Sequence, residues 1–588
     1  MGNAVMVLLG YIVGIIVIVL CMRRRREGLR SAVLLGYNFL FVAAISFSLL
    51  YTPGLSGPEL IRVMLLSIYQ APMIMGFQMG LEEFTQLQYV VIFVCASIYT
   101  IRTVAQALFR RFFNDMRLRM RVRRSKEVYL IFGELTDAQA LIEDIQRTVP
   151  RAAILYLDPN PDSDDMLPIS GALTTDWKHL LRLAPGHEYH AVLLPEPNHE
   201  NLSLLRRLEQ LGERLPNLHV TAFLDPGLLR LEDLDFTHLD AWLVSREQLL
   251  AQSHLNGHLP INWLKEHGRG REIGHVFVPD RPFSLCVVGF GPLSQEFLLT
   301  TYENTAFETA APDGRGLDAL IVSEDLPRCQ GAFFRDFPQL SRHPGLTWLN
   351  HGAEEEAFFD ALEPRLGSLD QIFIDTGDTA RNISTALRLL RLCRRRAVSP
   401  LPQLVVALHE DAPGSAELLS SVDCVTFLQD NRTQFTLEEL IRRRADREAQ
   451  ALHRRYQSAN GSAPDWHKMG TFLQASNRAV LWDIPNKLAL AGDLSGLSQQ
   501  EREQVYWRIA RYEHRRWNAF HFSRGWVPLR VEELSEQERA QCKTKHADER
   551  RHICLVDWEE LDALPQSEPG ILKFYDYENV AHVFERKS

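Results

Sequence analysis

The eight cysteines of this 588-residue chain are scattered along it, with no pairing or clustering. None stands in a C-x-x-C pair or at the spacing of zinc ligands, so the pattern gives no metal-site signal. Scattered cysteines are typical of small buried apolar residues in a reducing compartment. The sequence therefore predicts neither a disulfide framework nor a bound metal.

An excess of positive charge is missing beyond residue 126. Residues 1–126 hold 15 Lys and Arg against 5 Asp and Glu, and because the whole chain carries −10, the remainder carries −20. A surface that binds DNA or RNA needs a basic stripe, so we expect no nucleic-acid partner. The basic, apolar front instead fits the inner surface of a membrane.

A catalytic set is also missing. The 20 histidines include isolated ones such as His514, His521 and His552, but none has metal-ligand spacing or a visible catalytic partner. Isolated histidines are usually structural. We therefore expect no enzyme activity and assign no catalytic residue.

Three apolar runs are long enough to cross a hydrocarbon core, which needs roughly 20 residues. They are Val5 to Cys21, Ala32 to Tyr51 and Tyr89 to Phe109. Four arginines follow the first run, so it resembles an uncleaved anchor with its N-terminus outside. We expect a multi-pass protein of the inner membrane whose soluble domains are cytoplasmic.

The segment 59–80 is predicted to enter and leave the membrane on the outer side. Basic residues at 23–30 and 110–126 place both flanking segments in the cytoplasm, so an even number of crossings must join them. Pro58 favours a helix start, and Pro72 is expected to stop that helix after about 13 residues, or roughly 20 Å. The following residues would then return as irregular backbone.

A helix, a re-entrant segment and a second helix form the plan of a tetrameric cation-channel pore. The alternative is a surface helix packed on the outer leaflet side. No T-V-G-Y-G-like filter run occurs at 71–80, so potassium selectivity is not predicted. The candidate pore residues are Gln70, Met73, Gly76, Gln78 and Glu82.

The soluble body contains an internal repeat. Strand-like runs at 127–133 and 152–158 flank a helical pattern, and the same order recurs at 283–291 and 317–325. Each predicts the β-α-β opening of a doubly wound parallel sheet. Farther on, 191–208 matches 371–390, with Asn201 and Asn382 in corresponding places. Two copies of one Rossmann-like domain follow from this repeat.

The two copies, behind a pore-like segment, resemble the tandem RCK (TrkA-N-like) domains that regulate potassium conductance. The family pattern is a G-x-G-x-x-G turn and a T-G-D run after the fourth strand. The first copy keeps only Gly133 of the turn, so dinucleotide binding is not expected there. In the second copy the resemblance assigns a nucleotide or dinucleotide as regulatory ligand to Gly289, Gly291, Ser294, Glu324, Thr376, Gly377 and Asp378. A purely structural second lobe is the alternative.

The last 120 or so residues carry the most specific motifs. They include S-N-R at 476–478, E-H-R-R-W at 513–517, G-W at 525–526 and H-I-C-L-V-D-W at 552–558. Together these resemble the mainly helical RyR domain, the repeat named in ryanodine receptors and found in bacterial proteins. A planar polar ligand could be held by stacking and hydrogen bonds, and the alternative is that these residues lock the core. The candidate ligand residues are Glu513, Arg516, Trp517, Asn518, Trp526 and Trp558.

The predicted organisation is a transmembrane domain at 1–126, Rossmann-like domains at 127–280 and 281–450, and an RyR domain at 466–588. The role of residues 226–282 is left open. The leading functional hypothesis is a homo-oligomeric, ligand-gated cation-channel-like membrane protein whose soluble domains sense a small molecule. The alternative is a non-conducting, membrane-anchored nucleotide sensor or effector scaffold in stress or antiviral signalling.

Overall fold

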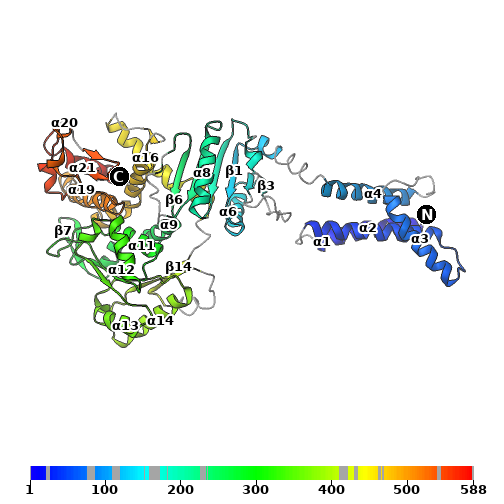
Figure 1. The fold of residues 1–588 in the computed structure, drawn as a ribbon, viewed down its shortest axis with the longest axis horizontal. Coiled ribbons are helices and arrows are strands. Elements are labelled where there is room, and N and C mark those ends of the chain that lie inside the picture. Colours follow the sequence, from blue (N-terminus) through cyan, green and yellow to red (C-terminus); the bar gives the residue numbers. More distant parts are fainter. Residues whose placement is uncertain are drawn as a thin grey trace. The chain divides into compact units, whose positions relative to one another are not determined.

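The computed structural model of the chain forms two compact units, Met1–Arg124 and Ser125–Ser588, drawn as a ribbon in Figure 1. The structure describes residues 2–585 except for several segments, which are 22–26, 76–86, 109–119, 158–171, 226–233, 410–421, 430–434, 461–464 and 540–543. A few single residues and one pair are also not described. The basic linker predicted at 110–126 thus falls largely outside the described residues.

The first unit is helical. Its labelled helices are α1 (Gly2–Cys21), α2 (Glu27–Leu50), α3 (Gly57–Met75) and α4 (Leu87–Leu108). Apolar residues such as Val42 and Ile92 form its core. The Tyr11 hydroxyl donates to the Asn38 side chain at 2.6 Å and so joins α1 to α2.

The three predicted membrane spans coincide with α1, α2 and α4. Across the described residues, however, no helix combines the length and the apolar character that crossing a bilayer requires. The prediction of a transmembrane domain therefore gains no support from the structure.

The predicted stop at Pro72 is wrong. Helix α3 continues through Pro72 to Met75 and is 19 residues long, which corresponds to about 28 Å. Proline removes one helical hydrogen bond, but Ser67 and Ala71 are fully buried on the same helix and α3 packs against α2, which offsets that cost. Of the candidate pore residues, Gln70 and Met73 lie in α3, and Gly76, Gln78 and Glu82 lie outside the described residues.

The second unit opens with a six-stranded parallel sheet, here called lobe 1 (127–244). Its strand order is β3-β2-β1-β4-β5-β6. The strands are β1 (Glu127–Phe132), β2 (Ala153–Leu157), β3 (Leu173–Thr175), β4 (Glu188–Leu193), β5 (Leu218–Phe223) and β6 (Asp240–Val244). Helices α6 (Leu135–Thr148), α7 (Trp177–Leu180) and α8 (Asn198–Gly212) connect them.

Lobe 2 (283–429) repeats this topology, with the order β11-β10-β9-β12-β13-β14. The strands are β9 (Phe283–Val288), β10 (Leu317–Val322), β11 (Leu346–Leu349), β12 (Gln371–Ile374), β13 (Gln403–Leu408) and β14 (Val425–Gln429). The connecting helices are α11 (Pro292–Asn304), α12 (Leu326–Asp336), α13 (Glu356–Leu362) and α14 (Thr379–Arg395). The two parallel sheets bear out the prediction of tandem Rossmann-like domains.

The central strands are apolar throughout because helices cover both faces of each sheet. In β9, Leu285 and Val287 face one hydrophobic cluster, and Cys286 and Val288 face the other. This alternation follows from the two-residue period of a strand. The run of six apolar or small residues at 283–288 is therefore the signature of a doubly covered strand.

The two asparagines of the repeat have the same structural task. The Asn201 amide donates to the carbonyl oxygens of Leu194 and Phe223 at 2.9 and 2.8 Å, which ties the end of β4 to the end of β5. The Asn382 amide donates to the Ala407 carbonyl at 2.9 Å in lobe 2. Both side chains are buried, so each satisfies backbone groups that the ends of the strands leave open.

The lobes exchange elements along the chain. Helix α9 (Arg246–Gly257) follows the last strand of lobe 1, yet its Leu250 and Ala251 belong to the core of lobe 2. Conversely Phe435, Leu437 and Leu440 follow the last strand of lobe 2 and pack into the core of lobe 1. This exchange, with α10 (Pro260–Glu266) and the hairpin β7 (Gly270–Ile273) and β8 (Val276–Pro279), accounts for much of the stretch 226–282.

The C-terminal domain is mainly helical. Its principal helices are α17 (Thr471–Trp482), α18 (Ile484–Ala491), α19 (Gln499–Phe522) and α21 (Ile571–Glu585), and the long α16 (Arg444–Asn460) precedes them. A small sheet contains β15 (Val527–Pro528), β16 (Lys545–His546) and β17 (Arg551–His552). Val505, Ile509 and Val580 are part of the same hydrophobic cluster as Leu285 of lobe 2. The domain and lobe 2 thus share one core.

Gly289 supplies a sharp test of the lobe 2 turn. Its φ is +85°, and an added Cβ would lie 1.9 Å from the Asp375 carbonyl oxygen, whereas Gly291 has ordinary φ and no atom within 4 Å of its Cβ position. We expect Gly289→Ala to lower the free energy of unfolding by about 2–4 kcal/mol and Gly291→Ala by less than about 1 kcal/mol. Urea denaturation of the full-length protein, followed by near-ultraviolet circular dichroism, measures both. Equal effects of the two substitutions would contradict the described turn.

Candidate functional site

The candidate site of lobe 2 lies at the carboxyl ends of β9 and β12. These strands are neighbours, but β10 lies on one side of them and β13 on the other, so the connecting helices leave in opposite directions along the sheet. Ligands of open α/β sheets bind in the crevice that this reversal creates. Gly289 turns the chain from β9 toward α11, and its missing side chain lets the backbone pass close to Asp375.

Helix α11 begins directly after this turn. Gly291 is its N-cap and gives no side-chain hydrogen bond, and Pro292 holds the first helical position. An N-terminus of this kind presents backbone N–H groups and a positive dipole to an anion. Ser294, the third predicted position of the motif, is fully buried, and its hydroxyl donates to Asp375 Oδ2 at 3.4 Å. Ser294 therefore supports the crevice from below.

Asp375 and His409 form a hydrogen-bonded pair at the base of the crevice, in which the carboxylate is buried and the imidazole is 39 % exposed. The two side chains, His409 Nε2 and Asp375 Oδ1, are 2.7 Å apart, and the Gly377 N–H donates to the same carboxylate oxygen at 3.2 Å. The hydrogen bond to Asp375 raises the pKa of His409 against the opposite effect of burial. Sequence reasoning missed this pair, although Asp375 directly precedes the T-G-D run and His409 directly follows β13.

The T-G-D run builds the turn before α14. The Thr376 N–H and hydroxyl both donate to Asn382 Oδ1, at 2.8 and 2.7 Å. Gly377 has a φ of +81°, a conformation that favours glycine. The Asp378 carboxylate caps α14 by accepting the Arg381 N–H at 2.7 Å. The run thus shapes the crevice wall through its backbone and its hydrogen bonds.

Arg381 crosses the mouth of the crevice. Its guanidinium lies 3.8 Å from the Glu324 carboxylate, which follows β10, and 3.5 Å from that of Glu354. Because β9 lies between β10 and β12, this ion pair joins segments that follow the two strands on either side of β9. The three side chains are partly or largely exposed, so the ion pairs are weak and can be exchanged for other partners.

Lobe 1 has lost the corresponding polar groups. The pairing of β1 with β4 matches that of β9 with β12, so Gly133 corresponds to Gly289 and Leu194 corresponds to Asp375. A Cβ on Gly133 would lie 2.7 Å from that of Leu194, and the Tyr156 hydroxyl donates to the Gly133 carbonyl at 2.9 Å. The turn is preserved, but an apolar side chain occupies the place of the carboxylate.

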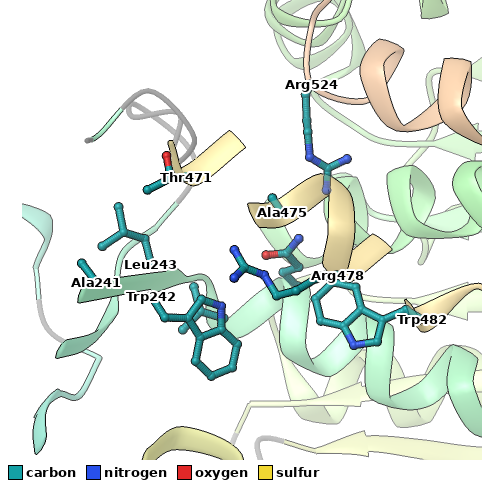
Figure 2. A pocket seen from close by; sticks show the side chains of 10 residues that line it. Ala241, Trp242, Leu243, Thr471, Ala475, Arg478, Trp482 and Arg524 are labelled. Carbon is teal, nitrogen blue, oxygen red and sulfur yellow. The ribbon is translucent and has the colours of Figure 1, made fainter. Parts of the chain in front are cut away.

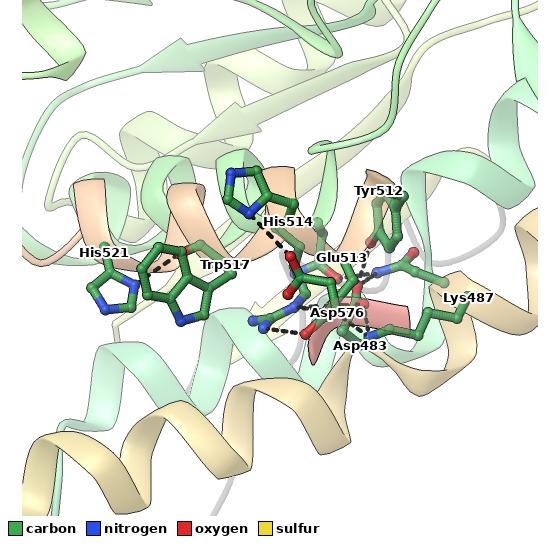
Figure 3. A network of polar contacts seen from close by, with 11 residues as sticks. Asp483, Lys487, Tyr512, Glu513, His514, Trp517, His521 and Asp576 are labelled. Carbon is green, nitrogen blue, oxygen red and sulfur yellow. Dashed lines mark hydrogen bonds and ion pairs between the residues drawn. The ribbon is translucent and has the colours of Figure 1, made fainter. Parts of the chain in front are cut away.

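The C-terminal candidates Glu513 and Arg516 belong to a buried network of four charges (Figure 3). Glu513 accepts two hydrogen bonds from Arg516, both at 2.8 Å, and lies 2.8 Å from Lys487 Nζ. Lys487 is also 2.6 Å from Asp483, which accepts a short hydrogen bond from the Tyr512 hydroxyl. Lys487, Glu513 and Arg516 are each no more than 2 % exposed, so they contact one another rather than solvent.

The remaining candidates do not converge on these charges. The Asn518 amide donates to the Val556 carbonyl at 2.8 Å, and Trp526 is buried against Phe472, with ring centres 4.9 Å apart. The Trp517 ring is tilted against that of His521, with centres 4.0 Å apart, and Trp558 lies beside His514. The burial of Glu513 and Arg516 favours the core-locking interpretation for that pair. A ligand contact stays a prediction for the partly exposed Trp517 and Trp558.

The second unit is thus a pair of Rossmann-like domains followed by a mainly helical domain. In the described part of the chain no group of three or more His, Cys, Asp or Glu is arranged to hold a metal ion. A scan of protein-family models finds none that matches the chain, and a search of curated proteins finds no relative.

Solved structures match only at low similarity. GsuK bound to ADP is 13% identical, with a TM-score of 0.30, over 68% of this chain and 94% of that chain. The GsuK channel bound to NAD is 12% identical, with a TM-score of 0.31, over 70% and 83% of the two chains. D-lactate dehydrogenase from Escherichia coli is 10% identical, with a TM-score of 0.20, over 53% and 90%. Matches this distant do not decide an activity.

The charge network predicts a specific pH dependence. Burial alone would raise the pKa of Glu513, but the charges of Arg516 and Lys487 lower it to about 2. Glu513→Gln leaves these cations incompletely compensated, and we expect a loss of about 3 kcal/mol in unfolding free energy at pH 7. Because the pKa of Glu513 is lower in the folded than in the unfolded protein, its charge stabilises the fold fully above about pH 4.5. The difference in unfolding free energy between wild type and Glu513→Gln should therefore shrink as the pH falls from about 4.5 toward about 2.

The control for this variant is Glu559→Gln. Glu559 is 61% exposed and pairs with Arg511 at 2.8 Å, so its loss should cost less than about 0.5 kcal/mol. Denaturant titrations of the full-length protein at several pH values compare the variants. A Glu513→Gln effect as small as that of the control would show that the network does not hold the domain together.

Proposed function

We propose that lobe 2 binds a nucleotide as a regulatory ligand at the carboxyl edge of its sheet. The observation that carries this proposal is the contrast between the lobes. Both keep the strand order and the glycine turn, but lobe 2 alone places the Asp375–His409 pair beneath the turn, where lobe 1 has Leu194. A buried carboxylate that holds a partly exposed imidazole beside a glycine turn is typical of a functional crevice rather than of a structural core.

The charges at the crevice suit a pyrophosphate. The uncapped first turn of α11 offers N–H donors, and Arg381 of the neighbouring α14 has exchangeable partners. A phosphate there would draw Arg381 away from Glu324 and Glu354, since a guanidinium binds phosphate oxygens in pairs. Glu324 would then be free to accept hydrogen bonds from a ribose.

The ligand would be sensed rather than consumed. Among the described crevice residues His409 is hydrogen-bonded to Asp375, and no nucleophile with an adjacent base stands beside them. In this proposal the consequence of binding is conformational.

Helix α9 offers the path for that consequence. It begins at Arg246, directly after β6 of lobe 1, and packs in the core of lobe 2. The charge of Arg246 lowers the pKa of His409, and the hydrogen bond to Asp375 raises that pKa by more. In this proposal a ligand that displaces charge at the crevice moves α9, which is covalently joined to lobe 1. This requires that the ligand binds two conformations with different affinity.

We extend the proposal to the N-terminal unit: ligand binding controls the passage of cations through a homotetramer. The support is in the sequence, where apolar helices are flanked by basic segments and acidic residues stand between them. The second candidate is the non-conducting membrane-anchored sensor or scaffold. The unbroken course of α3 through Pro72 and the missing filter run favour this second candidate.

Gly291→Asp tests nucleotide binding in lobe 2. The position has extended backbone and open space, so an aspartate there should cap α11 and preserve the fold while it repels a phosphate. We expect a fall of at least tenfold in the affinity for ADP, measured by isothermal titration calorimetry of the full-length protein. Gly291→Asn, a neutral cap of the same shape, is the matched control and should retain more of the binding. Equal affinities in all three proteins would refute the site.

Cation flux from liposomes tests the channel. Full-length protein should pass cations only when ADP is present, and the flux should vanish in Gly291→Asp but not in Gly291→Asn. ADP binding without flux, from protein shown to be folded and inserted, would reject the channel and select the anchored sensor. Flux that does not depend on ADP would show that lobe 2 does not control the pore.

A further inference from the structure

A pocket lies where lobe 1 meets the C-terminal domain (Figure 2). Strand β6 forms one wall and helix α17 forms the other, so the pocket joins segments more than 200 residues apart in the sequence. Ligand sites occur preferentially at such domain junctions. The lining residues that matter are Trp242, Gln248, Thr471, Arg478, Trp482 and Arg524.

Buried ion pairs fix the junction around the pocket. Arg443 Nη1 lies 3.0 Å from Asp240 of lobe 1 and 3.8 Å from Asp446 of α16. Asp446 in turn accepts a hydrogen bond from Arg478 of α17 at 2.5 Å. Arg443, Asp446 and Arg478 are all more than 90 % buried. Arg478 is therefore held in place at the pocket wall before any ligand arrives.

The pocket surface combines two guanidinium groups with two indole rings. The Arg478 guanidinium lies 5.9 Å from the centre of the Trp242 ring, and Trp482 lines the pocket from the end of α17. No acidic side chain lines it, and Thr471 and Gln248 bring further polar groups. Both guanidinium groups have carboxylate partners behind the lining, since Arg478 bonds to Asp446 and Arg524 Nη1 lies 2.7 Å from Glu303, so a phosphate has to share or displace these partners. Indoles stack on planar rings, and guanidinium groups recognise phosphate.

We propose that this pocket is a second ligand site, which takes a planar, anionic ligand of the mononucleotide class. The ring stacks on an indole, and the phosphate lies toward Arg478 and Arg524. The enclosed space is about 20 Å³, room for a water molecule, so the ligand occupies the open mouth between β6 and α17.

This site is independent of the crevice in lobe 2. Its residues come from lobe 1 and the C-terminal domain, and none of them belongs to the Gly289–Gly291 turn. A protein that carries Gly291→Asp therefore keeps this pocket. Measurements on the Gly291→Asp protein therefore test this pocket separately from the crevice in lobe 2.

The experiment uses AMP and full-length protein that carries Gly291→Asp. Ala475 lines the pocket on α17, so Ala475→Phe fills it, whereas Leu473→Phe places the same ring on the exposed face of the helix. We expect the AMP affinity measured by calorimetry to fall at least tenfold with Ala475→Phe and to change less than twofold with Leu473→Phe. Trp482→Leu, which removes a stacking ring from a half-buried position, should also weaken AMP by at least threefold.

Adenosine and inorganic phosphate are the other arms of the experiment. Both should bind at least tenfold more weakly than AMP, because each lacks half of the recognised chemistry. No AMP binding in the Gly291→Asp protein overturns the proposal. AMP binding that Ala475→Phe and Trp482→Leu leave unchanged overturns it as well, and adenosine binding as tight as AMP overturns the role of the two arginines.

Discussion

The close passage of the backbone at Gly289 past the Asp375 carbonyl is the constraint on which the candidate crevice depends. It requires a glycine with positive φ, and it brings the start of α11 beside the end of β12. The carboxylate of Asp375 can then lie beneath α11, where Ser294 and His409 hold it. The same passage occurs at Gly133 in lobe 1, but there it ends against Leu194. The same glycine turn thus borders a polar crevice in lobe 2 and an apolar core in lobe 1.

The strands and the repeat could be predicted because their signals are local. Doubly covered strands such as β9 are short apolar runs, and Asn201 and Asn382 stand at equal distances after matching strands. The glycine turn was equally visible. The Asp375–His409 pair was not, since the two residues are 34 positions apart and only strand register brings them together. The course of α3 through Pro72 was missed because packing of Ser67 and Ala71 outweighs a local rule.

The exchange between the lobes explains a second limit of sequence reasoning. The Thr221 hydroxyl donates to the Leu440 carbonyl across 219 positions, and Leu437 and Leu440 complete a core that begins at residue 129. No periodicity encodes such a contact. Together with α9, which crosses the other way, and with the core that lobe 2 shares with α19, it joins the parts of the second unit through packed contacts. These packed elements are the proposed route by which a change at one ligand site reaches the other.

The most direct measurement is hydrogen exchange of the full-length protein with and without ADP. The account predicts slower exchange at residues 289–295 and 376–381 of lobe 2, together with α9, and no direct protection at residues 133–138, the matching turn of lobe 1. The lobe 1 turn keeps the same strand order and serves as the internal control. Protection at 133–138 in place of the lobe 2 turn, or unchanged exchange at both turns at a saturating ADP concentration, would contradict the central claim that lobe 2 is the nucleotide sensor.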